Sequence, residues 1–87
     1  MASFQVVCSV YDRGTNSYAN PFVVAHKQLA LRSFKAECNR PPHESAIAAT
    51  PDDFELHQLA LFDPDNGTFT EDKQVLATAA SLIQAPE

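Results

Sequence analysis

The chain has 87 residues, of which 45% are apolar, and a net charge of −5. This length allows one hydrophobic core, and the apolar content excludes a disordered chain. No apolar run approaches the ~20 residues of a membrane-spanning helix. We therefore expect a single domain over residues 1–87, with a core at about 3–77 and a short helix or tail at 78–87. The charge is uneven, because residues 1–43 hold five cationic and two acidic side chains, whereas residues 44–87 hold one and nine.

The first predicted element is a strand over Phe4–Tyr11, where apolar and polar positions alternate. One side of this strand is apolar throughout and should face the core. Val7 lies on the other side, which suggests that this second face is partly covered too. A turn follows, in which Gly14 or Asn16 supplies a positive φ. The segment 18–24 then returns as extended chain beside the first strand, with Pro21 at an edge because proline cannot donate to a ladder. The predicted core positions of the first strand are Phe4, Val6, Cys8 and Val10, and Phe22 of the returning segment is also expected in the core.

A helix is predicted from His26, where the apolar period becomes helical. It should end before the two prolines at positions 41 and 42. Three kinds of side chain separate on its surface. The core stripe holds Ala30, Leu31, Phe34 and Cys38, a neighbouring flank holds Gln28, Arg32 and Lys35, and Leu29 and Ala36 form a spare apolar patch on the far side.

The second half predicts a strand over Phe54–Phe62 and a returning strand from Thr68, joined by a hairpin loop over 63–67. The alternation in the first of these strands is imperfect, and a bulge near Gln58 would restore it. Before the hairpin, residues 43–49 predict a short helix and Thr50 an N-cap with proline after it. After the hairpin, Thr78 is expected to cap a helix over 79–83. The fold class is therefore α+β, with a small antiparallel β-sheet packed on one main α-helix.

The sequence offers little for catalysis or metal binding. Cys8 and Cys38 lie in apolar patterns far apart, so buried reduced thiols are expected rather than a disulfide. The histidines and cysteines lack zinc spacing. The loop DPDNG has its glycine at the fifth position rather than the sixth of a calcium loop, which favours a plain hairpin. No glycine-rich phosphate loop and no catalytic triad spacing is present. We expect no enzyme, no cofactor and no metal.

Five short motifs occur in an order that resembles one family. They are SVYD, NPF, the helical A-x-R-x-F of Ala30, Arg32 and Phe34, then PDDFEL and LFDPDNG. Their order and spacing are similar to the small nonstructural DNA-binding protein of gokushovirus-type microviruses (Microviridae), bacteriophages with single-stranded DNA genomes. The similarity covers about Ser3 to Thr70. Ala60 departs from it, because the family usually has glycine there. The resemblance implies a role in viral DNA replication and genome packaging in the host cytoplasm, without a catalytic activity or a cofactor.

Binding of single-stranded DNA needs cations for the phosphates and aromatic faces for the bases. A homodimer would double the few cations of the front half, and a dimer interface is expected at Val7, Leu29 and Ala36. The alternative for Arg32 and Lys35 is a solvated face, or for Arg32 an ion pair with Asp12 or Glu37. The candidate nucleic-acid-binding residues are Arg13, Tyr18, Lys27, Arg32, Lys35 and Arg40.

A second hypothesis concerns the acidic half. Residues 52–72 could dock on a basic surface of a viral replication initiator or capsid precursor, so that the chain acts as a protein–protein adaptor. The start of the chain has no basic segment followed by a long apolar one, so no signal peptide is predicted and a cytosolic location is expected.

Overall fold

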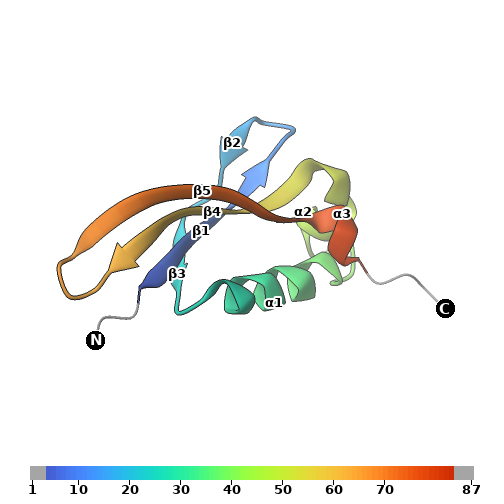
Figure 1. Ribbon diagram of the computed structural model, residues 1–87. Coiled ribbons are helices and arrows are strands. Elements are labelled where there is room, and N and C mark those ends of the chain that lie inside the picture. Colours follow the sequence, from blue (N-terminus) through green and yellow to red (C-terminus); the bar gives the residue numbers. More distant parts are fainter. Residues whose placement is uncertain (1–3, 84–87) are drawn as a thin grey trace.

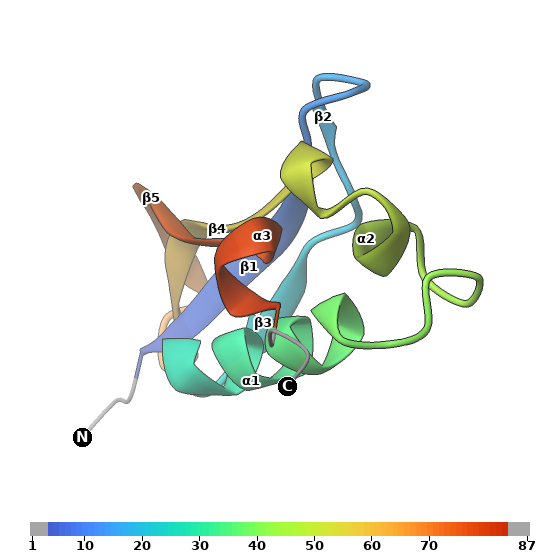
Figure 2. The same ribbon diagram turned by 90° about the vertical axis from the view of Figure 1, so that its right-hand side faces the viewer.

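The computed structural model describes residues 4–83 and confirms the α+β class. A five-stranded antiparallel sheet lies on one side and the main helix α1 (Lys27–Cys38) runs beneath it (Figure 1). The strand order is β2-β1-β4-β5, and β3 pairs with β1 at the same edge as β2. Seen along the sheet, α1 and α3 (Ala79–Leu82) lie on the same side of the strands (Figure 2).

The predicted first strand and its return are confirmed. β1 (Gln5–Asp12) pairs with β2 (Ser17–Tyr18) through its second half and with β3 (Phe22–Val24) through its first half. In the turn between β1 and β2, Asn16 takes the positive φ, at 57°. The break between β2 and β3 contains Pro21 at the sheet edge, as predicted. There the buried hydroxyl of Ser9 donates to the carbonyl of Ala19, at 2.6 Å.

The helix α1 is built as the apolar stripe predicts. Ala30, Phe34 and Cys38 are buried and Leu31 is half-buried against the core. The chain leaves the helix at Asn39, just before the two prolines that cannot continue it.

Two short helical segments connect α1 to the second half of the sheet. α2 (Ala46–Ala49) is capped by Ser45, whose hydroxyl accepts from the amide of Ala48 at 3.3 Å. The 3₁₀ segment η1 (Pro51–Asp53) begins with proline as expected. Thr50 occupies the predicted N-cap position of η1, but its side chain makes no capping hydrogen bond and instead donates to the carbonyl of Ala46 at 3.2 Å.

β4 (Phe54–Asp63) and β5 (Thr68–Thr78) form a long hairpin that ends in the predicted loop. Gly67 has φ 67° there, a conformation that a glycine adopts without a steric cost. The register shifts between Gln58 and Ala60, which confirms the bulge. Because of the bulge, Gln58 pairs beside Cys8 on the helix side, whereas Ala60 pairs beside Val7 on the opposite side.

The core lies between the sheet and the helices. Leu56 is fully buried at its centre. Phe4 and Phe22 were expected in the core but are 54% and 36% exposed. Phe4 lies just before β1, and Phe22 is the first residue of the edge strand β3. The core also continues past residue 77, since Ala79 of α3 is fully buried. The predicted core start at Ser3 and the tail over 84–87 lie outside the described residues. The core cluster is Val6, Cys8, Ala30, Phe34, Cys38, Leu56 and Ala79.

Both cysteines are free and buried, which confirms the expected reduced thiols. Burial raises the pKa of both the Cys8 and the Cys38 thiol, and the neighbouring Glu37 carboxylate raises that of Cys38 further. A thiol held in its neutral form packs as a small apolar side chain.

Candidate nucleic-acid interface

The exposed surface of α1 carries unpaired cations. Lys27, Arg32 and Lys35 are exposed, and within residues 4–83 none of them forms an ion pair or a side-chain hydrogen bond. Arg32 and Lys35 are three residues apart and therefore neighbours on the helix surface. Lys27 is the first residue of α1 and lies two turns before Phe34, so it is exposed at the start of the helix and not on the flank of Arg32 and Lys35. The ion pair of Arg32 with Asp12 or Glu37, which was the alternative to a role in DNA binding, is absent from this part of the chain. We call these three residues the α1 cations.

Carboxylates are scarce around the α1 cations. The only acidic residue in α1 is Glu37, and α2 and α3 contain none. Beyond these helices, the acidic residues of the described chain are Glu44 in the loop before α2, and others on η1, β1, β4, β5 and the hairpin loop. The helix layer is thus cationic on its outer surface, while the sheet and its hairpin are acidic.

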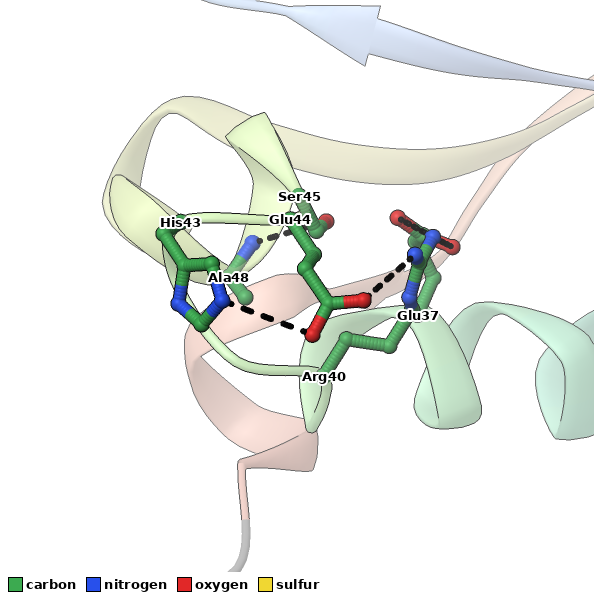
Figure 3. Close-up of polar contacts among 6 residues, drawn as sticks. All are labelled: Glu37, Arg40, His43, Glu44, Ser45 and Ala48. Atoms are coloured by element: carbon green, nitrogen blue, oxygen red, sulfur yellow. Dashed lines mark hydrogen bonds and ion pairs between the residues drawn. The ribbon is translucent and has the colours of Figure 1, made fainter.

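Arg40 is different, because it is held at the end of α1 by two carboxylates (Figure 3). Its guanidinium lies 3.1 Å from Glu37 and 3.6 Å from Glu44, and His43 lies 3.6 Å from the same Glu44. Hydrogen bonding and charge attraction from Glu37 raise the pKa of Arg40. The Ser45 hydroxyl, and after it Arg40, lower the pKa of Glu37. Arg40 therefore closes a local ion-pair network, and phosphate would have to compete with two carboxylates there.

Arg13 lies apart from α1, in the turn between β1 and β2. Its amide donates to the carbonyl of Asp53 at 2.7 Å, and its guanidinium donates to the carbonyl of Asp52 at 3.3 Å. This turn projects from the side of the sheet opposite α1 (Figure 1). Arg13 is thus tied to the acidic segment η1 and does not extend the α1 cations.

Tyr18 belongs to an aromatic cluster with Tyr11 and His57 on the face of the sheet opposite α1. The ring centroids lie 4.8–5.3 Å apart. His57 is held at both nitrogens, by the Tyr18 hydroxyl at 2.9 Å and by Glu55 at 2.8 Å. Tyr18 is 44% exposed, so part of its ring can still be reached. The pairing of Tyr11 with Tyr18 and with Glu55 across the sheet creates this cluster.

Reasoning from the sequence missed the aromatic cluster. The signal was the alternation that places His57 two residues after Glu55, on the same side of β4. It could not be used before the register of β4 against β1 was known, because a shift of one residue would have turned His57 to the helix side.

The three residues expected at a dimer interface do not share a surface. Val7 lies on the sheet face opposite α1, between Val23 and Ala60, and is only 8% exposed. Leu29 and Ala36 are exposed on the outer side of α1. A single flat contact cannot bury all three.

Other kinds of site are not evident in the described part of the chain. Residues 4–83 hold no pocket and no group of three or more metal-ligating side chains. None of their helices is long and apolar enough to cross a membrane.

Comparison with known proteins gives one family. The family model described as "Phage ORF5 protein" matches residues 5–82, from the first residue of β1 to the last of α3. No curated protein and no solved structure matches the chain.

Proposed function

Because the chain belongs to the Phage ORF5 protein family, we propose that it is a phage nonstructural protein that binds single-stranded DNA non-specifically. It would act in viral DNA replication and genome packaging in the host cytoplasm, as the resemblance to the gokushovirus-type microviruses implies. The proposal makes no use of catalysis, since it requires only contacts with the DNA backbone.

The observation that carries this proposal is the set of α1 cations. Lys27, Arg32 and Lys35 project from one helix, have no carboxylate partner within residues 4–83, and lie in a layer whose few carboxylates are engaged by Arg40. Cations without partners bind phosphate without first breaking an ion pair. Leu29, 37% exposed beside them, adds an apolar surface on which a base can rest.

Tyr18 and Arg13 take a smaller part in this proposal than the sequence suggested. Both lie away from the α1 cations, so a short strand of DNA cannot contact all of them at once. Base stacking on Tyr18 would need DNA that passes around the sheet edge. The main contact is therefore electrostatic, which favours weak, salt-sensitive and sequence-tolerant binding.

The test is a titration of a labelled oligothymidine, followed by fluorescence anisotropy at several salt concentrations. With three phosphate contacts on a single strand, log K should fall against log salt with a slope of about −2. The double variant Arg32→Glu/Lys35→Glu should abolish binding. An unlabelled duplex competitor shows whether single strands are preferred.

Arg13→Glu is the matched control for Arg32→Glu, because both reverse one exposed cation. The proposal expects Arg32→Glu to weaken binding strongly and Arg13→Glu to change it little. Circular dichroism confirms that each variant is folded. Equal losses from the two variants, or no binding of DNA at low salt, would overturn the assignment to α1.

A second candidate is the protein–protein adaptor, and it rests on η1. Asp52 and Asp53 are exposed there, and within residues 4–83 no cationic side chain forms an ion pair with either. Such a segment suits a basic surface on a replication initiator or capsid precursor. Glu55, which also lies in the acidic segment 52–72, is held by His57. The adaptor predicts no DNA binding at low salt and loss of the protein partner in Asp52→Asn/Asp53→Asn.

A further inference from the structure

The outer edge of β5 is the longest unpaired edge of the fold. β5 runs over 11 residues at the end of the strand order, and no strand of residues 4–83 pairs with its outer side. Two of its side chains, Phe69 at 66% and Val75 at 59%, are the most exposed large apolar side chains of the described residues. A free edge of this length offers a row of backbone donors and acceptors to another strand.

Pairing with β4 fixes which side chains share a face of β5. Phe69, Glu71 and Val75 pair with residues on the sheet face opposite α1. The register with β4 shifts between Glu71 and Gln74, where two residues of β5 stand opposite one of β4. Gln74 pairs with Gln58 on the helix side, three residues after Glu71, so the alternation of faces continues across the shift; it adds Lys73 to the exposed face and places Asp72 on the helix side. The exposed face thus has an apolar residue at each end and two opposite charges in the middle.

This pattern is self-complementary in one antiparallel register. With Asp72 opposite Asp72 of a second copy, Phe69 faces Val75 and Glu71 faces Lys73, each pair occurring twice. With the centre moved by one residue, Glu71 would face Glu71 or Lys73 would face Lys73. Like charges directly opposite each other are destabilising, and opposite charges stabilise. Glu71 and Lys73 therefore disfavour pairing of β5 in the shifted registers and favour it in this one.

We propose that a second copy of the chain docks on the free edge of β5, antiparallel, in the register that places Phe69 opposite Val75 and Glu71 opposite Lys73. The two sheets become one continuous sheet, with a two-fold axis at Asp72. The contact is isologous, as closed homodimers require. It uses none of Val7, Leu29 and Ala36, and it is independent of whether the chain binds DNA.

Asp72 destabilises this dimer, because the residue meets its own copy at the two-fold axis. Its carboxylate accepts from Gln58 Nε2 at 3.1 Å and from Gln74 Nε2 at 3.3 Å within its own chain. These amide donors partly compensate the negative charge, but two such carboxylates would still meet at the axis. The variant Asp72→Asn should therefore associate more tightly than the natural chain.

Charge exchange tests the register. Glu71→Lys and Lys73→Glu should each weaken self-association about tenfold or more, because two attractive pairs become repulsive. The double variant Glu71→Lys/Lys73→Glu restores opposite charges in both pairs and should recover dimerisation. The matched control is Asp65→Lys, an exposed reversal in the hairpin loop outside β5. Analytical ultracentrifugation over a concentration series, without DNA, measures the dissociation constants.

Cysteine cross-linking gives a second, geometric test. In the proposed register, residue 72 faces itself, whereas residue 74 faces residue 70 and lies ~13 Å from its own copy. Under mild oxidation Asp72→Cys should form a disulfide-linked dimer and Gln74→Cys should not, since Cys8 and Cys38 are buried. A monomer at every concentration, no rescue by the double charge exchange, or equal cross-linking at 72 and 74 would overturn the proposal.

Discussion

Among the cationic residues, identical side chains have different surroundings. Arg32 and Arg40 are both exposed arginines of the same segment, yet only Arg40 forms ion pairs in the described chain. Arg40 pairs with Glu37, three residues before it, and the turn through Pro41 and Pro42 adds Glu44. Helical spacing can indicate the first of these contacts, but the second depends on the path of the next loop.

The carboxylate of Glu37 makes the Arg40 network dependent on pH. The Ser45 hydroxyl and Arg40 hold the pKa of Glu37 below its ordinary value. A lowered pKa means that the carboxylate stabilises the fold above the ordinary glutamate pKa, and that this contribution is lost as the pH falls through the folded value. Glu37→Gln should therefore lower the melting temperature by about 2–4 °C at pH 7, with the gap closing below about pH 4.

Thermal unfolding across a pH series measures this gap directly. The control is Glu44→Gln, for which the ion pair with Arg40 is longer, at 3.6 Å against 3.1 Å, and which should show a smaller effect. A gap that stays constant between pH 7 and pH 3 would contradict a role for the charge of Glu37.

At the scale of elements, turn chemistry and alternation predicted most of the fold. The hairpin loop ending at Gly67, the stop at Pro41 and the cap at Thr78 depend on local backbone preferences, so they could be located without tertiary information. The prediction that Phe4 and Phe22 are buried was wrong because burial, unlike a turn or a cap, depends on tertiary packing. Their exposure depends on where α1 lies across the sheet, which no local pattern specifies.

The candidate site could be predicted only in part. Helical periodicity correctly placed Arg32 and Lys35 on one flank, because both belong to a single element. It could not place Arg13 or Tyr18 relative to that flank. Their positions depend on how the turn between β1 and β2 projects from the sheet, which is a property of the assembled strands.

The short helix α3 is an integral part of the core and not a tail. Thr78 Oγ1 accepts from the amide of Ser81 at 3.3 Å, and the side chain of Asn39, the C-cap residue of α1, donates to the carbonyl of Leu82 at 3.0 Å. Loss of the cap leaves the amide of Ser81 without its hydrogen-bond partner, so Thr78→Ala should reduce the free energy of unfolding by ~1 kcal/mol, and Thr78→Ser should retain most of this stability. Urea denaturation measures both.

The same denaturation experiment shows whether α3 unfolds together with the core or opens independently of it. If α3 unfolds with the rest, fluorescence and circular dichroism should report one transition with the same midpoint in each variant. A change confined to amide exchange in residues 79–82, with an unchanged midpoint, would show that α3 opens independently of the core.

At the scale of the whole molecule, the layers divide the charge. The α1 cations lie beneath the sheet, while the acidic residues of η1 and of the hairpin occupy the sheet and its ends. Such a division lets a molecule of net charge −5 approach an anionic polymer with one surface only. It also orients the molecule, since rotation by half a turn would present carboxylates to the phosphates.

Edge pairing through β5 would join two of these cationic surfaces. A two-fold axis perpendicular to the sheet keeps both helix layers on the same side of the continuous sheet, so the two sets of α1 cations face the same direction. One strand of DNA long enough to reach both would then meet six cations in place of three. Avidity of this kind raises affinity without any new contact in either copy.

The salt dependence of DNA binding, measured for the dimer and for a monomeric variant, tests whether dimerisation through β5 strengthens DNA binding. On a long oligothymidine, the dimer should show a slope of log K against log salt of about −4, and the dimerisation-impaired Lys73→Glu variant about −2. On an oligothymidine too short to reach both copies, the two proteins should give the same slope of about −2. Equal slopes on the long strand, measured where sedimentation shows one protein dimeric and the other monomeric, would mean that each copy binds DNA alone.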